Sequence, residues 1–147
     1  MFSQKIRGYT IFCDDIRQEI TGKAIYIGVY NGEINFSGPA PQSLPSFSIL
    51  INLMIDPDVS INQQLKLTVV FPGVEMPVVE ADIDVNAALA DSVNSLLPEQ
   101  LLRMQIPILS RNIVFAESGL VKVRGLVNGE ELKFGALKVN FHEQTQP

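Results

Sequence analysis

The densest group of reactive side chains in the sequence is the segment Cys13-Asp14-Asp15-Ile16-Arg17-Gln18-Glu19. A cysteine is a nucleophile only as a thiolate, so it needs an adjacent base or a positive environment. The neighbouring carboxylates raise the pKa of the Cys13 thiol, although Arg17 partly offsets them, and the only histidine is the distant His142. Because free cysteines are most often buried apolar residues, the sequence favours a core position for Cys13 over catalysis.

The same segment offers carboxylates to a hard cation. Asp14, Asp15 and Glu19 carry oxygen ligands of the kind that calcium prefers. Asp56 and Asp58 form a second acidic loop that would add to them if both loops lie at one end of the fold. No EF-hand spacing is present, so a metal site here depends entirely on that proximity.

The simpler interpretation of this segment is a network that fixes a loop. The planar guanidinium of Arg17 can bridge Asp14 or Asp15 and nearby backbone carbonyls. We therefore expect Asp14, Asp15, Arg17 and Glu19 to hold the loop in shape. Loops on rigid sheets commonly carry function, so these residues are also the first place to look for a ligand site.

No other segment shows a catalytic pattern. Ser110 and Ser118 lack a nucleophile elbow, and the single histidine would have to fold back to serve either of them. The glycines that follow predicted strands are not followed by the Lys-Ser or Lys-Thr of a phosphate-binding loop. The sequence therefore predicts a protein that is not an enzyme and that carries no cofactor.

Glu80, Asp82 and Asp84 form an acidic ladder along one predicted strand. Such a ladder could bind a cation or a basic partner. The favoured alternative is a solvated face whose charges oppose basic residues of other strands, each pair contributing well under ~1 kcal/mol. Those basic residues are Lys66, Lys122 and Arg124.

The elements that position these side chains are mostly strands, because apolar residues recur at every second position. Residues 64–71 and 77–85 both alternate in this way, and the breaker-rich connection between them makes the two strands neighbours. Residues 47–55 are apolar almost throughout, which predicts a strand that is buried on both faces or covered on its outer side.

The strongest turn signal is Asn128-Gly129, between the alternating residues 120–127 and 131–141. This pair tolerates the positive φ values of a type I′ turn and so predicts a β-hairpin. Asn31-Gly32 offers a second tight turn, between predicted strands over residues 23–30 and 33–36.

A first strand is predicted over residues 9–13. Residues 15–22 would form the loop that follows it, with Cys13 and Ile27 in the core of the resulting hairpin.

Two later regions are less regular. Residues 102–110 and 112–116 predict either one bent strand or two short ones. Residues 86–97 space their apolar side chains as a helix does, with Asn86 as a plausible N-cap and Pro98 favouring an extended conformation before it. We expect one short connecting helix or turn there.

Together these elements predict an all-β fold, an antiparallel two-sheet sandwich that spans residues 1–147 as a single domain. The segment from Glu117 to Glu130 resembles the closing hairpin of immunoglobulin-like domains, where a glycine precedes an alternating strand, a tight turn and a final strand. That resemblance implies an immunoglobulin-like architecture and carries no activity.

The N-terminal motif also has a family resemblance. Phe12 to Glu19, followed by Gly22-Lys23 and by Ile27 to Tyr30, resembles the signature of a family of small bacterial proteins without an assigned function. The resemblance covers about the first 35 residues. It implies a bacterial origin and the same β architecture, and it supplies no activity.

Charge and cysteine content narrow the partners and the compartment. The net charge is −5, and the eleven lysines and arginines form no run of three, so nucleic acid and anionic membranes are poor partners. The single cysteine excludes an intrachain disulfide, and the first residues lack the apolar core of a signal peptide, which favours the cytoplasm. The low density of charged residues favours a sheet face that another molecule covers. The predicted function is therefore a protein-interaction or structural accessory module, with self-association through a sheet face as one form of the interaction. The alternative function is metal-ion or small-ligand binding by the acidic segment.

Overall fold

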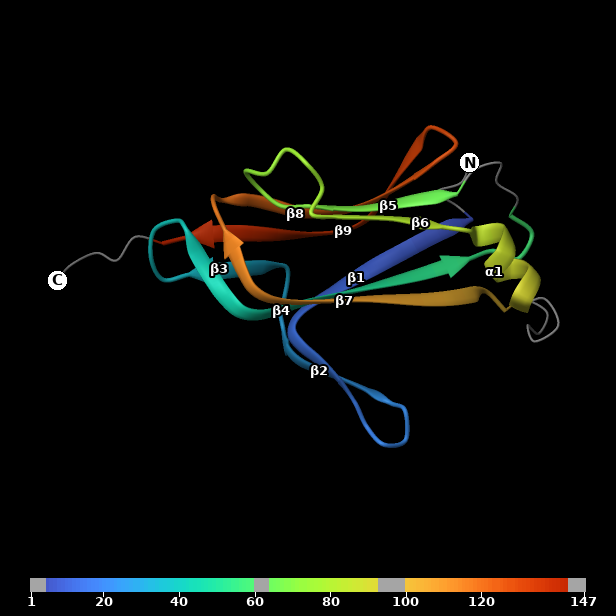
Figure 1. Cartoon of the computed structure of the whole chain (residues 1–147), viewed down its shortest axis with the longest axis horizontal. Coiled ribbons are helices and arrows are strands. Elements are labelled where there is room, and N and C mark those ends of the chain that lie inside the picture. Colours follow the sequence, from blue (N-terminus) through green and yellow to red (C-terminus); the bar gives the residue numbers. More distant parts are fainter. Residues whose placement is uncertain (1–4, 60–63, 93–99, 143–147) are drawn as a thin grey trace.

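The strands of the protein pair into two sheets that lie face to face (Figure 1). The computed structural model describes residues 5–59, 64–92 and 100–142. The four-stranded sheet has the order β2-β1-β4-β7, made of β1 (Ile6–Gln18), β2 (Ala24–Val29), β4 (Gln42–Ile55) and β7 (Leu102–Phe115). The five-stranded sheet has the order β3-β9-β8-β5-β6, made of β3 (Glu33–Phe36), β5 (Leu65–Val70), β6 (Val79–Ile83), β8 (Gly119–Val127) and β9 (Glu130–Phe141). The predicted two-sheet sandwich is confirmed.

The strand order agrees with an immunoglobulin-like arrangement. In such domains strands A, B and E are neighbours in one sheet, and strands G, F and C are neighbours in the other. Here β1, β4 and β7 correspond to strands A, B and E. In the other sheet β9, β8 and β5 correspond to strands G, F and C, and β6 lies beyond β5. All strand pairs but one are antiparallel, as the sequence predicts for most of the fold. After β2 the chain crosses to the other sheet, and β3 joins it at the edge, parallel to β9.

The core contains alternate residues of both sheets, as the period-2 pattern predicts. Leu65, Leu67 and Val69 of β5 are fully buried, and so are Val121 and Val123 of β8. These side chains pack in one cluster with the inward residues of β4, so the two sheets share a single apolar interior.

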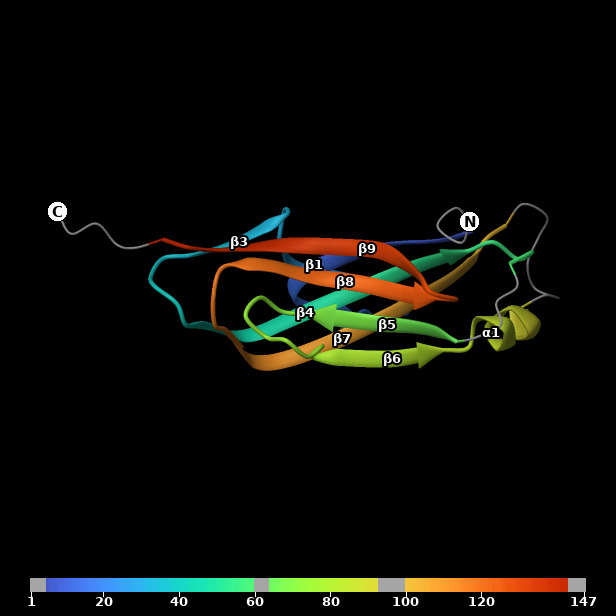
Figure 2. The same cartoon turned by 90° about the horizontal axis from the view of Figure 1, so that it is seen from above.

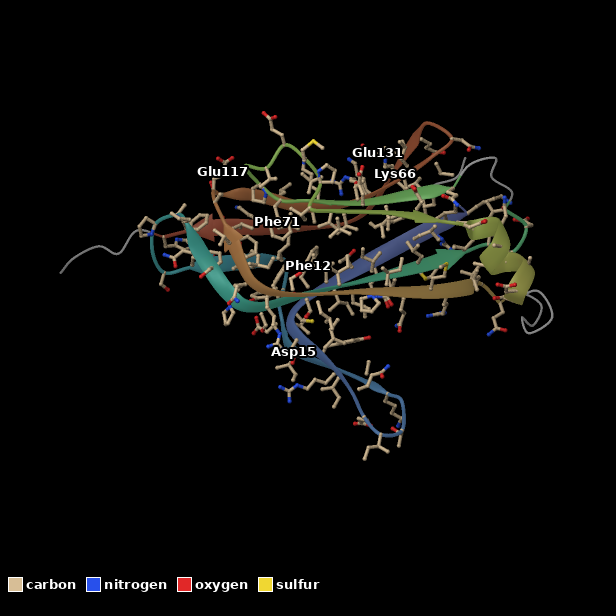
Figure 3. The ribbon with its side chains drawn as sticks, in the orientation of Figure 1. Phe12, Asp15, Lys66, Phe71, Glu117 and Glu131 are labelled. Atoms are coloured by element: carbon tan, nitrogen blue, oxygen red, sulfur yellow. The ribbon has the colours of Figure 1, made fainter. Side chains whose placement is uncertain are left out.

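Aromatic rings join the two sheets. The ring of Phe47 on β4 lies 6.3 Å from that of Phe12 on β1 and 5.5 Å from that of Phe115 on β7. It also meets Phe71, which follows β5 in the other sheet, at 6.2 Å between centroids. Figure 3 shows Phe12 and Phe71 pointing into the space between the layers. Such ring pairs add about 0.5–1.5 kcal/mol each beyond their buried area.

Along one side of the sandwich β1 and β9 approach closely enough to need glycine. A Cβ on Gly8 would lie 2.8 Å from Cδ1 of Phe134 and 2.9 Å from the backbone oxygen of Asn52. A Cβ on Gly135 would lie 2.9 Å from Cβ of Thr10, whose hydroxyl donates to the backbone oxygen of Phe134 at 2.9 Å. The missing side chains therefore let the two sheets close on each other here.

The two Asn-Gly pairs have different roles. Asn128 and Gly129 have φ values of 48° and 81°, so the predicted type I′ hairpin between β8 and β9 is confirmed. The predicted hairpin at Asn31-Gly32 is wrong, because β2 and β3 belong to different sheets. There the backbone oxygen of Gly32 instead accepts a hydrogen bond from the N–H of Lys138 at 3.1 Å.

The two less regular regions are now defined. β7 is one strand with a local irregularity at Asn112, whose φ is 54°. The predicted short helix is α1 (Val85–Ser92), at one end of the sandwich in Figure 2; residues 93–97 lie outside the described residues. Asn86 is not its N-cap, because the carboxylate of Asp84 accepts from the N–H of Ala87 at 2.9 Å. Among the described residues no helix has the length and apolar character that crossing a bilayer requires.

We expect Gly8→Ala to lower the free energy of unfolding by about 1–3 kcal/mol, because the added methyl meets backbone and ring atoms that cannot move aside. Urea unfolding measures this change. Gly38→Ala is the matched control, since its methyl would meet only the end of the flexible Gln42 side chain. An equal loss in both variants would contradict the close packing described for β1 and β9.

Candidate functional site

The N-terminal motif lies on a β-hairpin and not on a loop. β1 continues through Gln18 and stays paired with β2, so the predicted loop over residues 15–22 is wrong. The actual turn is short and begins at Glu19, whose N–H donates to the backbone oxygen of Lys23 at 2.8 Å. The hairpin reaches away from the five-stranded sheet (Figure 1), which leaves Ile27 40% exposed instead of in the core.

Because successive residues of a strand point to opposite faces, the two aspartates of the motif are separated. Asp14 points to the core side, where its carboxylate accepts a 2.5 Å hydrogen bond from the hydroxyl of Tyr30. Gly28 lies opposite Asp14 with a φ of 65°, and a Cβ there would overlap the carboxylate. Burial, and then the Asp14 hydrogen bond, raise the pKa of the Tyr30 phenol far above its ordinary value.

Asp15 points to the other face and pairs with Arg17, with 3.0 Å between Oδ2 and Nε. Of the two aspartates that Arg17 was expected to bridge, it pairs with Asp15. The hydrogen bond from Arg17 holds the pKa of the Asp15 carboxyl below its ordinary value, and Arg111 of β7 adds a smaller attraction. The Arg17 side chain is 68% exposed and that of Asp15 is 37% exposed, so solvent screens the pair, which contributes little to stability and mainly orders the hairpin.

The acidic residues do not gather around a cation. Glu19 accepts from the Thr21 hydroxyl at 3.2 Å, and Asp58 pairs with Lys5 at 2.7 Å. The N–H of Asp58 donates to the Asp56 carboxylate at 3.1 Å, so that loop is held by its own contacts. Within residues 5–59, 64–92 and 100–142, no three metal-binding side chains cluster.

Cys13 is a buried thiol, as its sequence context favoured. Its side chain is fully covered, and its Sγ donates to the backbone oxygen of Asp15 at 3.4 Å. Burial, followed by the charge of Asp14, raises the pKa of this thiol. The thiolate that nucleophilic chemistry requires is therefore disfavoured at neutral pH.

The remaining sequence candidates lie elsewhere. Glu80 of the acidic ladder pairs with Lys66 at 3.3 Å, which agrees with a solvated face of the five-stranded sheet. His142 closes the β3–β9 pair through its N–H, which donates to the backbone oxygen of Phe36, and through Nε2, 2.9 Å from Oδ1 of Asn35. Figure 3 places Lys66 and Asp15 on opposite sides of the molecule.

The four-stranded sheet presents an unusual outer face, by which we mean the side that points away from the core. Its strands are in register, so outward side chains form rows across β1, β4 and β7, with β2 joining the last row. The rows are Arg7, Met54 and Arg103; Tyr9, Asn52 and Gln105; Ile11, Leu50 and Pro107; and Val29, Cys13, Ser48 and Leu109. Near one end of the sheet, the apolar rows thus give way to a row that has an arginine at each of its two ends.

The projecting hairpin extends this face. Ile25 and Ile27 of β2 lie beside Arg17 and Asp15 in the register and are both about 40% exposed. Arg111 of β7 lies at the same end of the sheet, since it acts electrostatically on Asp15. The apolar centre therefore has arginines at both ends.

Arginine is concentrated on the outer face, whereas most other charged residues are elsewhere. Four of the five arginines of the chain are among the outward residues of this sheet. Of the acidic residues that the structure describes, Asp15 alone is among the outward strand residues of this sheet, so the net charge of these residues is positive although the chain carries −5. The five-stranded sheet instead mixes both signs and forms the pairs Lys66–Glu80 and Arg124–Glu131.

Strand β4 is buried on this side as well. Ser48, Leu50 and Asn52 point outward and yet are 2%, 3% and 7% exposed, because longer side chains of β1 and β7 flank them. The two-sided burial predicted for residues 47–55 is therefore confirmed. The outer face was missed as a site, although the alternate residues Arg7-Tyr9-Ile11 and Arg103-Gln105-Pro107-Leu109-Arg111 carried its signal.

Comparison of the chain with protein-family models, with curated proteins and with solved structures finds no match. The resemblance of the N-terminal motif to a bacterial family therefore stays a prediction.

We expect the Cys13 thiol to resist alkylation by iodoacetamide until the protein unfolds, because its side chain is fully covered. The comparison is the double variant Cys13→Ser, Leu109→Cys, which places a thiol in the same row at a position that is 63% exposed. The native protein should react about 100-fold more slowly than this variant, since reaction of a buried group waits for opening. Equal rates would contradict the burial and reopen a catalytic role.

The Tyr30 phenol should ionise only well above its ordinary pKa of 10.0. The unfolded chain loses this proton first, so the stabilisation is fully present below about pH 10 and decreases as the pH rises beyond it. Tyrosinate absorbance of the native protein minus that of Tyr30→Phe isolates this group, and unfolding at several pH values measures the slope. A Tyr30 that ionises near pH 10 would contradict its bond to Asp14.

Proposed function

We propose that this protein is a non-enzymatic interaction module of the cytoplasm that docks another protein on the outer face of its four-stranded sheet. The observation that carries the proposal is the composition of that face, an apolar centre bounded by arginines. Protein interfaces are enriched in aromatic residues, methionine and arginine, and they are depleted in lysine and glutamate. The outward strand residues of this sheet, from these rows to the projecting hairpin, include Tyr9, Met54 and four arginines, with no lysine or glutamate among them.

Exposure supports the same proposal. Leu109 is 63% exposed and Val29 is 56% exposed, and both lie in one row with Ile27 nearby. Contiguous apolar surface of this kind marks sites that another molecule covers. The outer face of the other sheet has separate exposed leucines, Leu120 and Leu126, among charged side chains.

The partner docks on the face and not along the free edge of β7. An added strand would need an uninterrupted row of backbone donors, and Pro107 in the middle of β7 has none. The outward side chains, by contrast, form continuous rows across the sheet, so the face offers an uninterrupted surface to a partner.

Charge favours a different protein over a second copy of this chain. If two copies of the chain paired this face about a two-fold axis, arginines of one copy would lie opposite arginines of the other. The like charges would repel, and only Asp15 would offset them. A partner whose apolar surface is bordered by carboxylates would be complementary at both ends. Self-association through this face is therefore an outcome for experiment to exclude.

A photo-reactive amino acid at position 109 tests the proposal in the cells that make the protein. Irradiation should give one discrete adduct that is heavier than the 16.2 kDa chain by the mass of the partner. The same probe at Leu126 is the matched control, because this leucine is also exposed but lies on the other sheet. The adduct should be lost in an Arg7→Glu, Arg103→Glu background.

Three outcomes would contradict the proposal. No adduct at position 109, or equal adducts at 109 and 126, would mean that the outer face is not a docking surface. An adduct of twice the chain mass, abolished by dilution, would mean that the face joins two copies of this chain.

A further inference from the structure

A recess lies on the outer face near the end that carries Arg7 and Arg103. Its volume is about 370 Å³, and its lining includes Tyr9, Asn52 and Arg103. Asn52 is the central residue of its row and lies between Tyr9 and Gln105, so its side chain lies at the floor of the recess. The recess is thus part of the outer face and adjoins the apolar rows.

The floor of the recess carries an unused hydrogen-bond donor. Asn52 is 7% exposed, and its Oδ1 accepts from Nε2 of Gln105 at 3.0 Å. Its Nδ2 is buried and, in the part of the chain that the structure describes, has no hydrogen-bond partner. An unsatisfied buried donor costs about 1–3 kcal/mol, and each such group in a native protein calls for an explanation. A ligand acceptor bound in the recess would supply the missing hydrogen-bond partner and thereby explain the unsatisfied donor.

The rim of the recess is positive. Arg103 lines the recess, and Arg7 lies at the other end of the same row, beyond Met54. Over residues 5–59, 64–92 and 100–142, no ion pair joins either guanidinium to a carboxylate. The neutral donor of Asn52 and the guanidinium group of Arg103 both line the recess, and together they select an acceptor that carries negative charge.

We propose that the recess over Asn52 is a subsite for a carboxylate of the docking partner, supplied by an aspartate, a glutamate or a chain terminus. This inference rests on the proposed function. The carboxylate accepts from Nδ2 of Asn52 and pairs with Arg103, while apolar side chains of the partner cover Ile11 and Leu109 in the apolar rows. The subsite thereby fixes the register of the partner on a face that is otherwise apolar.

A carboxylate fits better than the phosphate of a nucleic acid. The rows on the other side of the recess from Arg103 are apolar, and they would be left against a hydrated sugar–phosphate backbone. In addition, a chain of net charge −5 repels a polyanion, whereas a single carboxylate on an apolar partner brings only one negative charge.

The side-chain amide of Asn52 reports binding directly by nuclear magnetic resonance. Titration with N-acetylglutamate N-methylamide should shift its signal saturably in the millimolar range, and the neutral glutamine counterpart should not. Arg103→Gln should weaken this binding about fivefold or more. Arg111→Gln, at the other end of the face, should leave it unchanged.

Asn52→Leu separates this subsite from a purely structural role. The variant should lose glutamate binding and yet show a higher urea midpoint than the native protein, because it removes the unsatisfied donor. If Asn52 instead serves the fold, the midpoint falls and the proposal is wrong.

The remaining outcomes are equally decisive. An unmoved Asn52 signal, equal shifts with the glutamine compound, or shifts with inorganic phosphate or a single-stranded oligonucleotide alone would overturn the carboxylate subsite. A photo-adduct at position 109 that forms equally in Asn52→Leu would overturn the subsite and leave the docking function intact. Absence of that adduct from the unmodified sequence as well would overturn the docking function itself.

Discussion

Strand β4 is paired on both edges and buried on both faces, and the rest of the structure follows from that constraint. Its inward residues, from Phe47 to Ile55, place hydrocarbon against the five-stranded sheet. Its outward residues include Ser48 and Asn52, which are covered although they are polar. Burying a polar side chain costs free energy unless it is hydrogen-bonded, so a face that served only to meet water would not hold Asn52 in this way. This burial supports the contact surface that we propose on the outer side of β4.

The N-terminal motif and the outer face are parts of one arrangement. The bond between Asp14 and Tyr30, packed against Gly28, fixes β2 beside β1. Once β2 is fixed, Ile25 and Ile27 extend the outer face beyond the sandwich. The motif that drew attention as a reactive cluster thus acts through packing and hydrogen bonding, and it positions the apolar residues that we propose a partner covers.

Local patterns predicted local structure well. The alternation of residues 64–71 predicted the buried side of β5, and Asn128-Gly129 predicted its turn because the conformation depends on those two residues alone. Asn31-Gly32 misled because a turn signal does not say which sheet the next strand joins. Ile27 was placed in the core because alternation does not reveal that a hairpin projects past the opposing sheet. The outer face was missed for a related reason: its rows require the register between β1, β4 and β7, segments that are distant in the sequence.

Hydroxyl-radical footprinting of the protein, once purified and once in extract of the cells that make it, tests the central claim most directly. If a partner covers the outer face, oxidation of Tyr9, Met54 and Leu109 should fall several-fold in the extract, while Leu120 and Leu126 on the other sheet stay as reactive as before. Equal oxidation of the outer face in both samples would contradict the account.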